Sequence, residues 1–248
     1  MLAAGAGTRL APLTRLRPKA LCPVDNVALV DHAIARAATA TSTIAVNAHH
    51  GLAQMEQHLV AGIGADVHLS IERERALGTA GALGLLREWI DGRPVLVTNA
   101  DAWLTVDLAP FVEEWDGERI RLLVVEDRDR PDFGSARYSG VALMPWSDVS
   151  GLEATPSGLY ELVWRYAFEL GRLDLVDHDG PFVDCGTPAD YLRANLLASG
   201  GAPVVGPGAL VDPSAVLERC VVWPGAVVRP GERLVDAVRT VDLTVLVR

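Results

Sequence analysis

Apolar and polar positions alternate along residues 1–200 in a pattern that predicts short strands between amphipathic helices. The expected strands are the short apolar runs 44–47, 66–71, 95–98, 120–125 and 138–144. The expected helices are 29–41, 52–60, 78–90, 107–115, 158–170 and 188–198, the last with Thr187 as N-cap and Pro188 at the first helical position. This alternation predicts a three-layer α/β domain with a mostly parallel central sheet. Ligands of such sheets bind beyond the carboxyl ends of the strands, so functional residues are expected in the loops that follow apolar runs.

The pattern changes at about Ala202. The segments VGPGAL, VDPSAV, VWPGAV and VRPGER each place an apolar residue two positions before a proline. Pro207 and Pro213, and again Pro224 and Pro230, are separated by the same six-residue interval. A hexapeptide period is typical of a β-helix, so we expect a main domain over 1–200 and a short β-helical tail over 201–248. An irregular proline-rich tail is the alternative.

Composition narrows the function classes. The 248 residues carry a formal net charge of −10, which argues against non-specific nucleic-acid binding. The three cysteines include no Cys-x-x-Cys pair, so neither a disulfide framework nor a zinc knuckle is expected. No apolar run approaches the roughly 18 residues that a membrane helix needs, and the first positive charges follow the first apolar stretch instead of preceding it. We therefore expect a cytoplasmic protein without a membrane segment.

The chain contains a single lysine, Lys19, among 22 basic residues. One reading is that this lysine survived by chance in a chain that otherwise uses arginine. The other is that it does something a guanidinium cannot, since a compact ammonium can act as a point charge on a phosphate.

The densest candidate chemistry lies near the start, where residues 2–14 read LAAGAGTRLAPLT and residues 17–24 read RPKALCPV. Small residues and two glycines allow the backbone N–H groups to approach an anion, and Arg9 can bind phosphate oxygens in bidentate fashion. A Walker P-loop is excluded because its Gly-Lys-Ser/Thr ending is absent. A dinucleotide fingerprint is excluded because Leu10 stands where its third glycine would be.

These two segments closely resemble the signature of the sugar-1-phosphate nucleotidyltransferases, which make NDP-sugars. Three later segments are similar to further motifs of that family in the same order: ALGTAGAL (76–83) to the nucleotide-base loop, VTNADAW (97–103) to the first metal-ligand segment and FVDCGTPADYL (182–192) to the second. The tail resembles the left-handed β-helix of several members, notably mannose-1-phosphate guanylyltransferases. The resemblance implies a Rossmann-like nucleotidyltransferase domain followed by a short left-handed β-helix.

The resemblance also implies roles for individual residues. Arg9 and Lys19 would be the catalytic cations, and Asp101 and Asp184 would share a Mg²⁺ ion. The bottom-up reading agrees for the two aspartates, because each follows an apolar run and two carboxylates with waters and phosphate oxygens suit Mg²⁺. The residues expected to contact the nucleotide are Ala3, Ala4, Gly5, Gly7, Thr8, Arg9, Asn47, Gly78, Thr79, Ala80 and Gly81. The residues expected on the sugar-phosphate side are Lys19 and, by position only, Gly134, Ser139, Gly140 and Glu161.

The implied reaction joins an NTP and a sugar 1-phosphate into an NDP-sugar and releases pyrophosphate, with guanylyl transfer to mannose 1-phosphate as the favoured version. The alternative is a weakly active or inactive NDP-sugar-binding regulatory homologue. Two departures favour it: Met1 almost begins the glycine-rich motif, which leaves little sequence for a first strand, and a second lysine is absent. The identity of base and sugar stays open. A homodimer is expected, since the valine-rich tail with Trp223 could pair with a second subunit.

Overall fold

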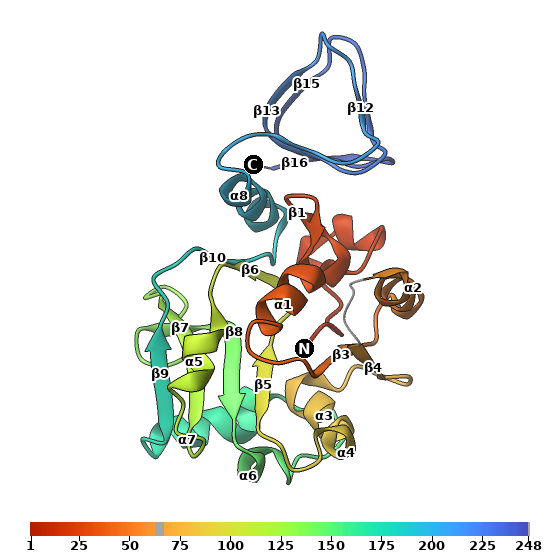
Figure 1. The fold of residues 1–248 in the computed structure, drawn as a ribbon. Coiled ribbons are helices and arrows are strands. Elements are labelled where there is room, and N and C mark those ends of the chain that lie inside the picture. The colour runs from red at the N-terminus through yellow and green to blue at the C-terminus, as the bar shows by residue number, and fades with distance from the viewer. Residues whose placement is uncertain (63–66, 248) are drawn as a thin grey trace. The chain divides into compact units, whose positions relative to one another are not determined.

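The structure is a computed structural model that describes residues 1–62 and 67–247 (Figure 1). Asp66, the first residue of the expected strand 66–71, therefore lies outside the described residues. The chain forms two compact units, and each is described by itself. The first unit comprises Met1–Gly5, Ala33–Ala100 and Thr105–Phe182; the second comprises Ala6–His32, Asp101–Leu104 and Val183–Arg248. This grouping cuts across the expected boundary near residue 200, because the tail shares a unit with segments of the expected main domain.

The first unit is built on a mixed sheet. Its strands are β3 (Ile44–Ala48), β4 (Val67–Ile71), β5 (Val95–Thr98), β7 (Ile120–Glu126), β8 (Ala136–Met144) and β9 (Leu173–Asp177). β3 pairs in parallel with β4, and the order β5-β8-β7-β9 forms a four-stranded sheet. Pairing is parallel between β7 and β9 and antiparallel on both sides of β8. A short hairpin loop explains the direction of β8, because such a loop can join only antiparallel strands.

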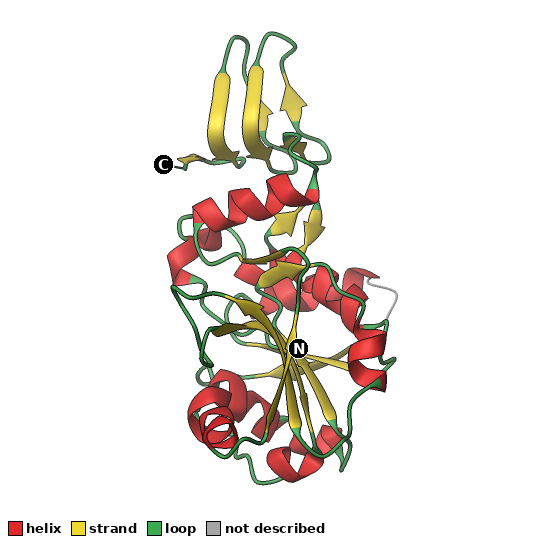
Figure 2. Ribbon diagram, turned by 90° about the vertical axis from the view of Figure 1, so that its left-hand side faces the viewer, coloured by secondary structure: helices red, strands yellow, loops and turns green. Residues whose placement is uncertain are grey.

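Helices flank these strands on both sides (Figure 2). The helices that lie wholly in the first unit are α2 (Leu52–Gly62), α3 (Gly78–Leu85), α4 (Arg87–Ile90), α5 (Leu108–Glu113), α6 (Trp146–Val149) and α7 (Arg165–Glu169), and α1 (Leu29–Ala37) ends in it. The expected helix 78–90 is thus two helices, and 158–170 is a π-helical turn (Tyr160–Trp164) that continues into α7. None of the described helices has both the length and the apolar character that crossing a bilayer requires.

The core of this unit lies between the helices and the central strands β7 and β8. Leu122, Val124, Ala142 and Met144 are fully buried there and pack with helix residues such as Leu83. A strand covered on both faces is expected to be a nearly continuous apolar run, and most of the residues of β7 and β8 are apolar. The described part of this unit is therefore a mixed α/β fold, as the alternation of elements predicted. The expectation of a mostly parallel sheet is wrong for the four-stranded sheet, because β8 pairs antiparallel with both β5 and β7.

The first residues of the chain lie between β3 and β5. The Met1 amine donates to the Ala45 oxygen at 2.7 Å and the Asn47 N–H donates to the Met1 oxygen at 3.1 Å. On the other side, the Leu2 N–H donates to the Thr98 oxygen at 2.9 Å. Leu2 bridges both neighbouring strands in parallel and so connects the two sheets.

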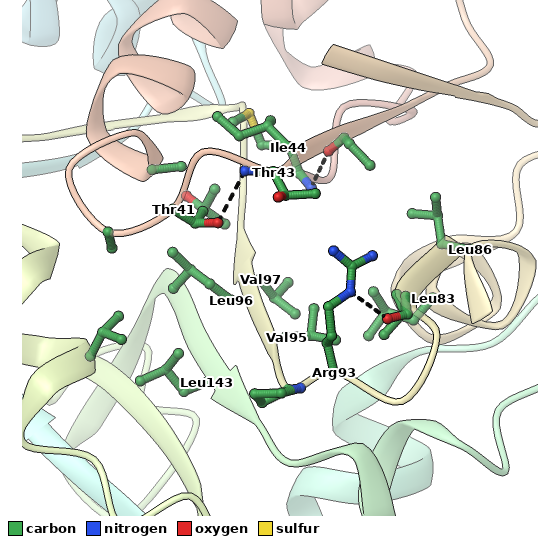
Figure 3. Close-up of a pocket in the computed structure, with 18 of the residues that line it drawn as sticks. Thr41, Thr43, Ile44, Leu83, Leu86, Arg93, Val95, Leu96, Val97 and Leu143 are labelled. Carbon is green, nitrogen blue, oxygen red and sulfur yellow. Dashed lines mark hydrogen bonds between the residues drawn. The ribbon is translucent and has the colours of Figure 1, made fainter. Parts of the chain in front are cut away.

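A cavity of about 290 Å³ opens beside Met1, between the amino ends of β3 and β5 (Figure 3). Its wall is largely apolar and comes from both strands and from α3 and α4. The lining side chains include Ile44, Leu83, Leu86, Val95, Leu96 and Val97. Among the described residues, Leu2 forms isolated bridges to Asn47 on one side and to Asn99 on the other.

The second unit combines segments that are far apart in the sequence. Its elements before the tail are β1 (Pro23–Val24), β2 (Val27–Ala28), β6 (Ala102–Leu104), the end of β10 (Phe182–Asp184) and α8 (Pro188–Ala198). β1 and β2 form an antiparallel pair, and β6 pairs with β10. The start of α8 is as expected: the Thr187 hydroxyl accepts from the Asp190 N–H at 3.2 Å, and Pro188 occupies the first turn.

The tail winds into coils of parallel strands. Its strands are β11 (Val204–Val205), β12 (Leu210–Val211), β13 (Val216–Val222), β14 (Val227–Val228), β15 (Arg233–Arg239) and β16 (Thr244–Leu246). Val204 pairs with Val221 and Leu210 with Val227, so equivalent positions are 17 residues apart, one fewer than three hexapeptides. The coil is triangular in Figure 1. One corner is shortened by a left-handed backbone at Arg219 and Asp236, whose side chains form a salt bridge at 2.7 Å.

Candidate active site

The second unit brings one ammonium and two carboxylates together. Lys19 begins a 3₁₀ turn (Lys19–Leu21), Asp101 directly precedes β6, and Asp184 is the last residue of β10. Because β6 and β10 are paired strands, both carboxylates reach the same region. The Lys19 Nζ donates to Asp101 Oδ2 at 2.9 Å and to Asp184 Oδ1 at 3.3 Å. The three residues expected at the metal and phosphate positions therefore lie in direct contact.

The environment of the three groups differs. The Lys19 side chain is 7% exposed, while Asp101 and Asp184 are 46% and 23% exposed. Burial by itself lowers the pKa of Lys19, but the charge and hydrogen bond of Asp101, together with the charge of Asp184, outweigh it and leave the pKa raised. The ammonium is thus held in its charged form at a fixed place, with the carboxylates between it and solvent.

Arg9 lies beside the same cluster but is far more exposed. Its Nη2 is 3.7 Å from Asp184 Oδ2, and its side chain is 67% exposed. Gly186 lies close to the Arg9 side chain, because a Cβ at this glycine would be 3.1 Å from Arg9 Nη2. An exposed guanidinium that is held by one long contact can turn toward a phosphate group at little cost.

Gly7 lets the glycine-rich loop approach Lys19. Its φ of 60° is left-handed, and a Cβ there would lie 2.9 Å from both Lys19 Cβ and Thr14 Cγ2. The Thr14 hydroxyl donates to the Gly7 oxygen at 3.1 Å, and Thr8 begins the exposed 3₁₀ turn that carries Arg9. In this unit the close approach of the loop thus depends on the absence of a side chain at Gly7.

The two carboxylates fit the donor set of a Mg²⁺ ion. Asp101 Oδ2 and Asp184 Oδ1 both accept from the buried Lys19 ammonium, so the two carboxylates lie near each other. No group of three or more potential protein ligands occurs among the described residues. Two carboxylates would therefore leave coordination positions to water and substrate phosphates, which is the arrangement Mg²⁺ usually adopts.

In the first unit, Asn47 supports the start of the glycine-rich loop. Its Oδ1 accepts from the Ala3 N–H at 2.6 Å and its Nδ2 donates to Glu72 Oε1 at 2.6 Å. The second oxygen of Glu72 accepts from the Leu77 N–H at 2.7 Å. Asn47 is 2% and Glu72 3% exposed, so this chain of bonds is shielded from water. It ties the loop at Ala3 to the segment that enters α3.

The sequence analysis missed Glu72. Its only signal was a carboxylate directly after the apolar strand β4, which is compatible with a surface loop. Ala4 and Gly5, also expected at the nucleotide, continue the loop from Ala3. The Ala4 oxygen lies 3.0 Å from His50 Nδ1, and a side chain at Gly5 would meet open space. Gly5 is therefore the part of this loop with room for a ligand at its backbone.

The expected base-contacting residues form the first turn of α3. Gly78 and Gly81 turn toward the backbone of Ser157 and Thr155, and a Cβ at either glycine would collide with it. The Thr79 hydroxyl accepts from the Leu159 N–H at 2.8 Å, and the Ala80 N–H donates to the Ser157 oxygen at 3.0 Å. In this structure the glycines let α3 pack against segment 153–159, so any base contact would use the remaining face of the turn.

The expected sugar-side residues are dispersed in the first unit. Ser139 and Gly140 lie in an irregularity of the β7–β8 pairing, where the register shifts between Leu123 and Val124. The buried Ser139 hydroxyl donates to the Leu123 oxygen at 2.8 Å. Gly134 is an exposed turn residue with φ of 66°, and Glu161 is exposed in the π-helical turn. The structure does not gather these four residues into one cluster.

Gly140 has a neighbour that the sequence analysis did not single out. A Cβ at Gly140 would lie 3.1 Å from Asn99 Cβ, so the glycine makes room for the Asn99 side chain. Asn99 Oδ1 is buried, and the described residues supply no hydrogen-bond partner for it. A buried acceptor without a partner is costly, so Asn99 is held here at an energetic cost. Motif reading passed over Asn99 because it drew attention to the aspartate two positions later.

Comparisons with known proteins point to one family. The model of the nucleotidyl transferase family matches residues 1–144. The chain is 31% identical over 226 residues to the N-acetylmuramate alpha-1-phosphate uridylyltransferase of Caulobacter vibrioides, covering 78% of this chain and 93% of that protein. It is 27% identical over 229 residues to the mannose-1-phosphate guanyltransferase of Debaryomyces hansenii, covering 79% of this chain but only 63% of that protein.

A solved structure supports the fold. It is a protein assigned as a glucose-1-phosphate thymidylyltransferase from Bacillus anthracis, in complex with a sucrose, and it superposes with a TM-score of 0.70 at 23% identity. The superposition covers 79% of this chain and 93% of that chain.

The ion cluster predicts how Lys19 titrates. Asp101→Asn removes the charge that most strongly opposes the effect of burial, so the pKa of Lys19 should fall. NMR of protein labelled at lysine measures this directly, because Lys19 is the single lysine and gives one side-chain signal. Asp116→Asn, an exposed site paired with Arg119 in the first unit, serves as the control and should leave the signal in place. An unchanged pKa in Asp101→Asn would contradict the geometry.

The packing of α3 predicts that one added methyl group at Gly81 lowers the stability of the protein. Gly81→Ala forces a Cβ against the Thr155 backbone, and we expect it to lower the free energy of unfolding by about 2 kcal/mol. Gly151→Ala is the matched control, since a Cβ there meets nothing and should change stability by less than about 0.5 kcal/mol. Denaturant unfolding of both variants decides the matter; equal stability would show that segment 153–159 gives way freely.

Proposed function

The chain belongs to the nucleotidyl transferase family, as a member of the sugar-1-phosphate nucleotidyltransferases, and on that premise we propose that it transfers a nucleotidyl group from an NTP to a hexose 1-phosphate, releasing pyrophosphate and an NDP-sugar. The observation that carries the proposal is the contact of Lys19 with Asp101 and Asp184. A buried ammonium beside two carboxylates supports a site that would bind phosphate oxygens and a cation.

In the proposed reaction an oxygen of the sugar phosphate attacks the α-phosphorus of the NTP. The new P–O bond forms as the bond to the β-phosphate oxygen breaks, and pyrophosphate leaves with the bonding electrons. Such a transfer depends on position and on neutralised charge more than on covalent help from the protein. A bound Mg²⁺ ion would supply charge neutralisation at the phosphates and would be held by Asp101 and Asp184.

Lys19 and Arg9 would divide the cationic work. The buried Lys19 ammonium has a fixed position and suits the phosphate of the incoming sugar, where an orienting charge is needed. The exposed Arg9 guanidinium can follow the β- and γ-phosphates and stays with them as pyrophosphate leaves. Backbone groups of Ala3, Ala4, Gly5, Gly7 and Thr8 would line the nucleotide, and Asn47 would hold their loop in place.

For the base and sugar, the LGTAGAL loop and the coiled tail support guanylyl transfer to mannose 1-phosphate. A second candidate is uridylyl transfer to N-acetylmuramate 1-phosphate. It is favoured by the Caulobacter relative, 93% of whose length the chain covers. A cytoplasmic location, a homodimer and a left-handed hexapeptide β-helix remain predictions of the same proposal.

Pyrophosphate release tests the proposed function. Purified protein should release pyrophosphate only when an NTP, Mg²⁺ and a hexose 1-phosphate are all present, measured for five NTPs against a panel that includes mannose and N-acetylmuramate 1-phosphates. Asp101→Asn should lower turnover at least about a hundredfold because the metal ligand is lost. Glu113→Gln, an exposed carboxylate in α5, is the control and should retain full turnover. Tight NDP-sugar binding without turnover on the whole panel would instead identify a regulatory homologue.

A further inference from the structure

The segment that carries Lys19 has little regular structure of its own. Between Pro12 and β1 it consists of two 3₁₀ turns, Leu13–Arg15 and Lys19–Leu21. Such turns are short and are stabilised by few internal hydrogen bonds. The place of the Lys19 ammonium therefore depends on what the rest of the second unit packs against this segment.

The tail supplies part of that packing. Cys22 and Val24, which flank the end of the segment, are fully buried in one hydrophobic core with Val204, Val221 and Trp223. This core also contains α8 residues and so joins the tail to the Lys19 segment directly. The apolar side of the coils thus packs inside the second unit, next to the segment that carries the candidate catalytic lysine.

Trp223 makes the most specific of these contacts. Its indole N–H donates to the Tyr191 hydroxyl at 2.9 Å, and that hydroxyl donates to the Pro23 oxygen. An indole nitrogen can only donate, so it fixes the direction of the relay: the Tyr191 oxygen accepts from Trp223, and its single proton points to Pro23. Pro23 has no backbone N–H, so its carbonyl oxygen is its only backbone hydrogen-bonding group. The Tyr191 hydroxyl satisfies this oxygen in a site from which water is excluded.

A second contact reaches the segment from its other end. The Arg17 guanidinium carbon lies 4.4 Å from the centroid of the Trp223 ring, in cation–π geometry. Arg17 and Pro23 lie on either side of Lys19 in the sequence. Trp223 is therefore linked directly to the Arg17 side chain before the lysine and, through Tyr191, to the Pro23 backbone after it.

Two further hydrogen bonds hold the β1–β2 turn that ends the segment. Asn195 Oδ1 on α8 accepts from the Asp25 N–H at 3.0 Å, and Asn26 Nδ2 donates to the Val205 oxygen at 3.2 Å. Both turn residues have left-handed backbones. The turn is thus bonded to α8 and to the first coil of the tail.

We propose that the tail is a positioning element of the active site and that Trp223 is the residue through which it sets the place of the Lys19 ammonium. Trp223 does not touch the reacting groups, so it acts through Arg17, Tyr191 and Pro23. Its catalytic consequence rests on the proposed function; its effect on the place of Lys19 does not.

Two variants separate the contacts of Trp223. Trp223→Leu removes both the ring under Arg17 and the donor to Tyr191. Trp223→Phe keeps an aromatic ring of similar bulk and removes only the donor, and it covers the case in which the leucine variant fails to fold. Trp115→Leu is the matched control, because Trp115 lies in the first unit and its indole donates to a different carbonyl, that of Arg119.

The first measurement is independent of turnover. Reductive methylation followed by mass spectrometry reports the accessibility of Lys19 alone among side chains, since the chain has no other lysine. Trp223→Leu should raise the methylation rate of Lys19 on the order of tenfold, because a loosened segment opens locally more often, and Trp223→Phe should raise it less. Trp115→Leu should leave it unchanged even where its melting temperature falls equally. The same methylation rate in Trp223→Leu and Trp115→Leu would overturn the proposal.

The second measurement is the split between kcat and KM in the pyrophosphate assay. Displacement of Lys19 should lower kcat on the order of tenfold in Trp223→Leu while the KM for the NTP changes less than about twofold. A rise in the KM for the NTP with unchanged kcat would contradict a positioning role for Trp223. Absence of turnover in the unsubstituted protein would refute the proposed function, while the methylation rates would still decide whether Trp223 places Lys19.

Discussion

The candidate site depends on one buried ammonium held by two carboxylates from paired strands. A charged lysine that is 7% exposed is stable only with partners, and Asp101 and Asp184 supply them. The same contacts keep the carboxylates close together despite their like charge. The second unit is arranged around this need: Gly7 gives the loop room beside Lys19, β6 and β10 present the aspartates side by side, and the tail packs the segment from behind. Removing any one of the three charges leaves the others poorly compensated, so they form a single electrostatic element.

Elements with a strong hydrophobic pattern were predictable from the sequence. Elements whose structure depends on pairing with a neighbouring strand were not. The strands β3, β5, β7 and β8 are apolar runs covered on both sides, and α8 carries its cap in its own sequence, so both were found. β9 was missed because it reads LDLVD and is half-buried along most of its length, and only its pairing with β7 makes it a strand. The split of 78–90 into α3 and α4 reflects tertiary packing at Leu86, which helical periodicity does not reveal. In the tail, the six-residue spacing was visible, but the shortened corner at Arg219 and Asp236 needed coordinates.

For the site, motif reading found residues whose chemistry is rare and missed those whose role is support. The family resemblance drawn from the motifs is confirmed by the match over residues 1–144. Lys19 stood out because it is the single lysine, and the aspartates because they follow apolar runs. Glu72 and Asn99 are common residue types at unremarkable positions, and only burial and hydrogen bonding distinguish them. The glycines of α3 illustrate the opposite error: a glycine can make room for a ligand or for the protein's own backbone, and here Gly78 and Gly81 face segment 153–159.

The contrast between the two cations explains why one position is lysine in a chain that otherwise uses arginine. Lys19 lies close to Gly7, where a Cβ would be 2.9 Å from Lys19 Cβ, and its compact ammonium contacts both carboxylates, whereas a planar guanidinium would need more room. Arg9 has the opposite requirement, since its exposed side chain gains from a planar fork that can grip a group arriving from solvent. The buried ammonium of Lys19 and the exposed planar guanidinium of Arg9 thus meet different requirements. Where the surroundings leave room for only one of them, the residue type follows from the space as much as from the charge.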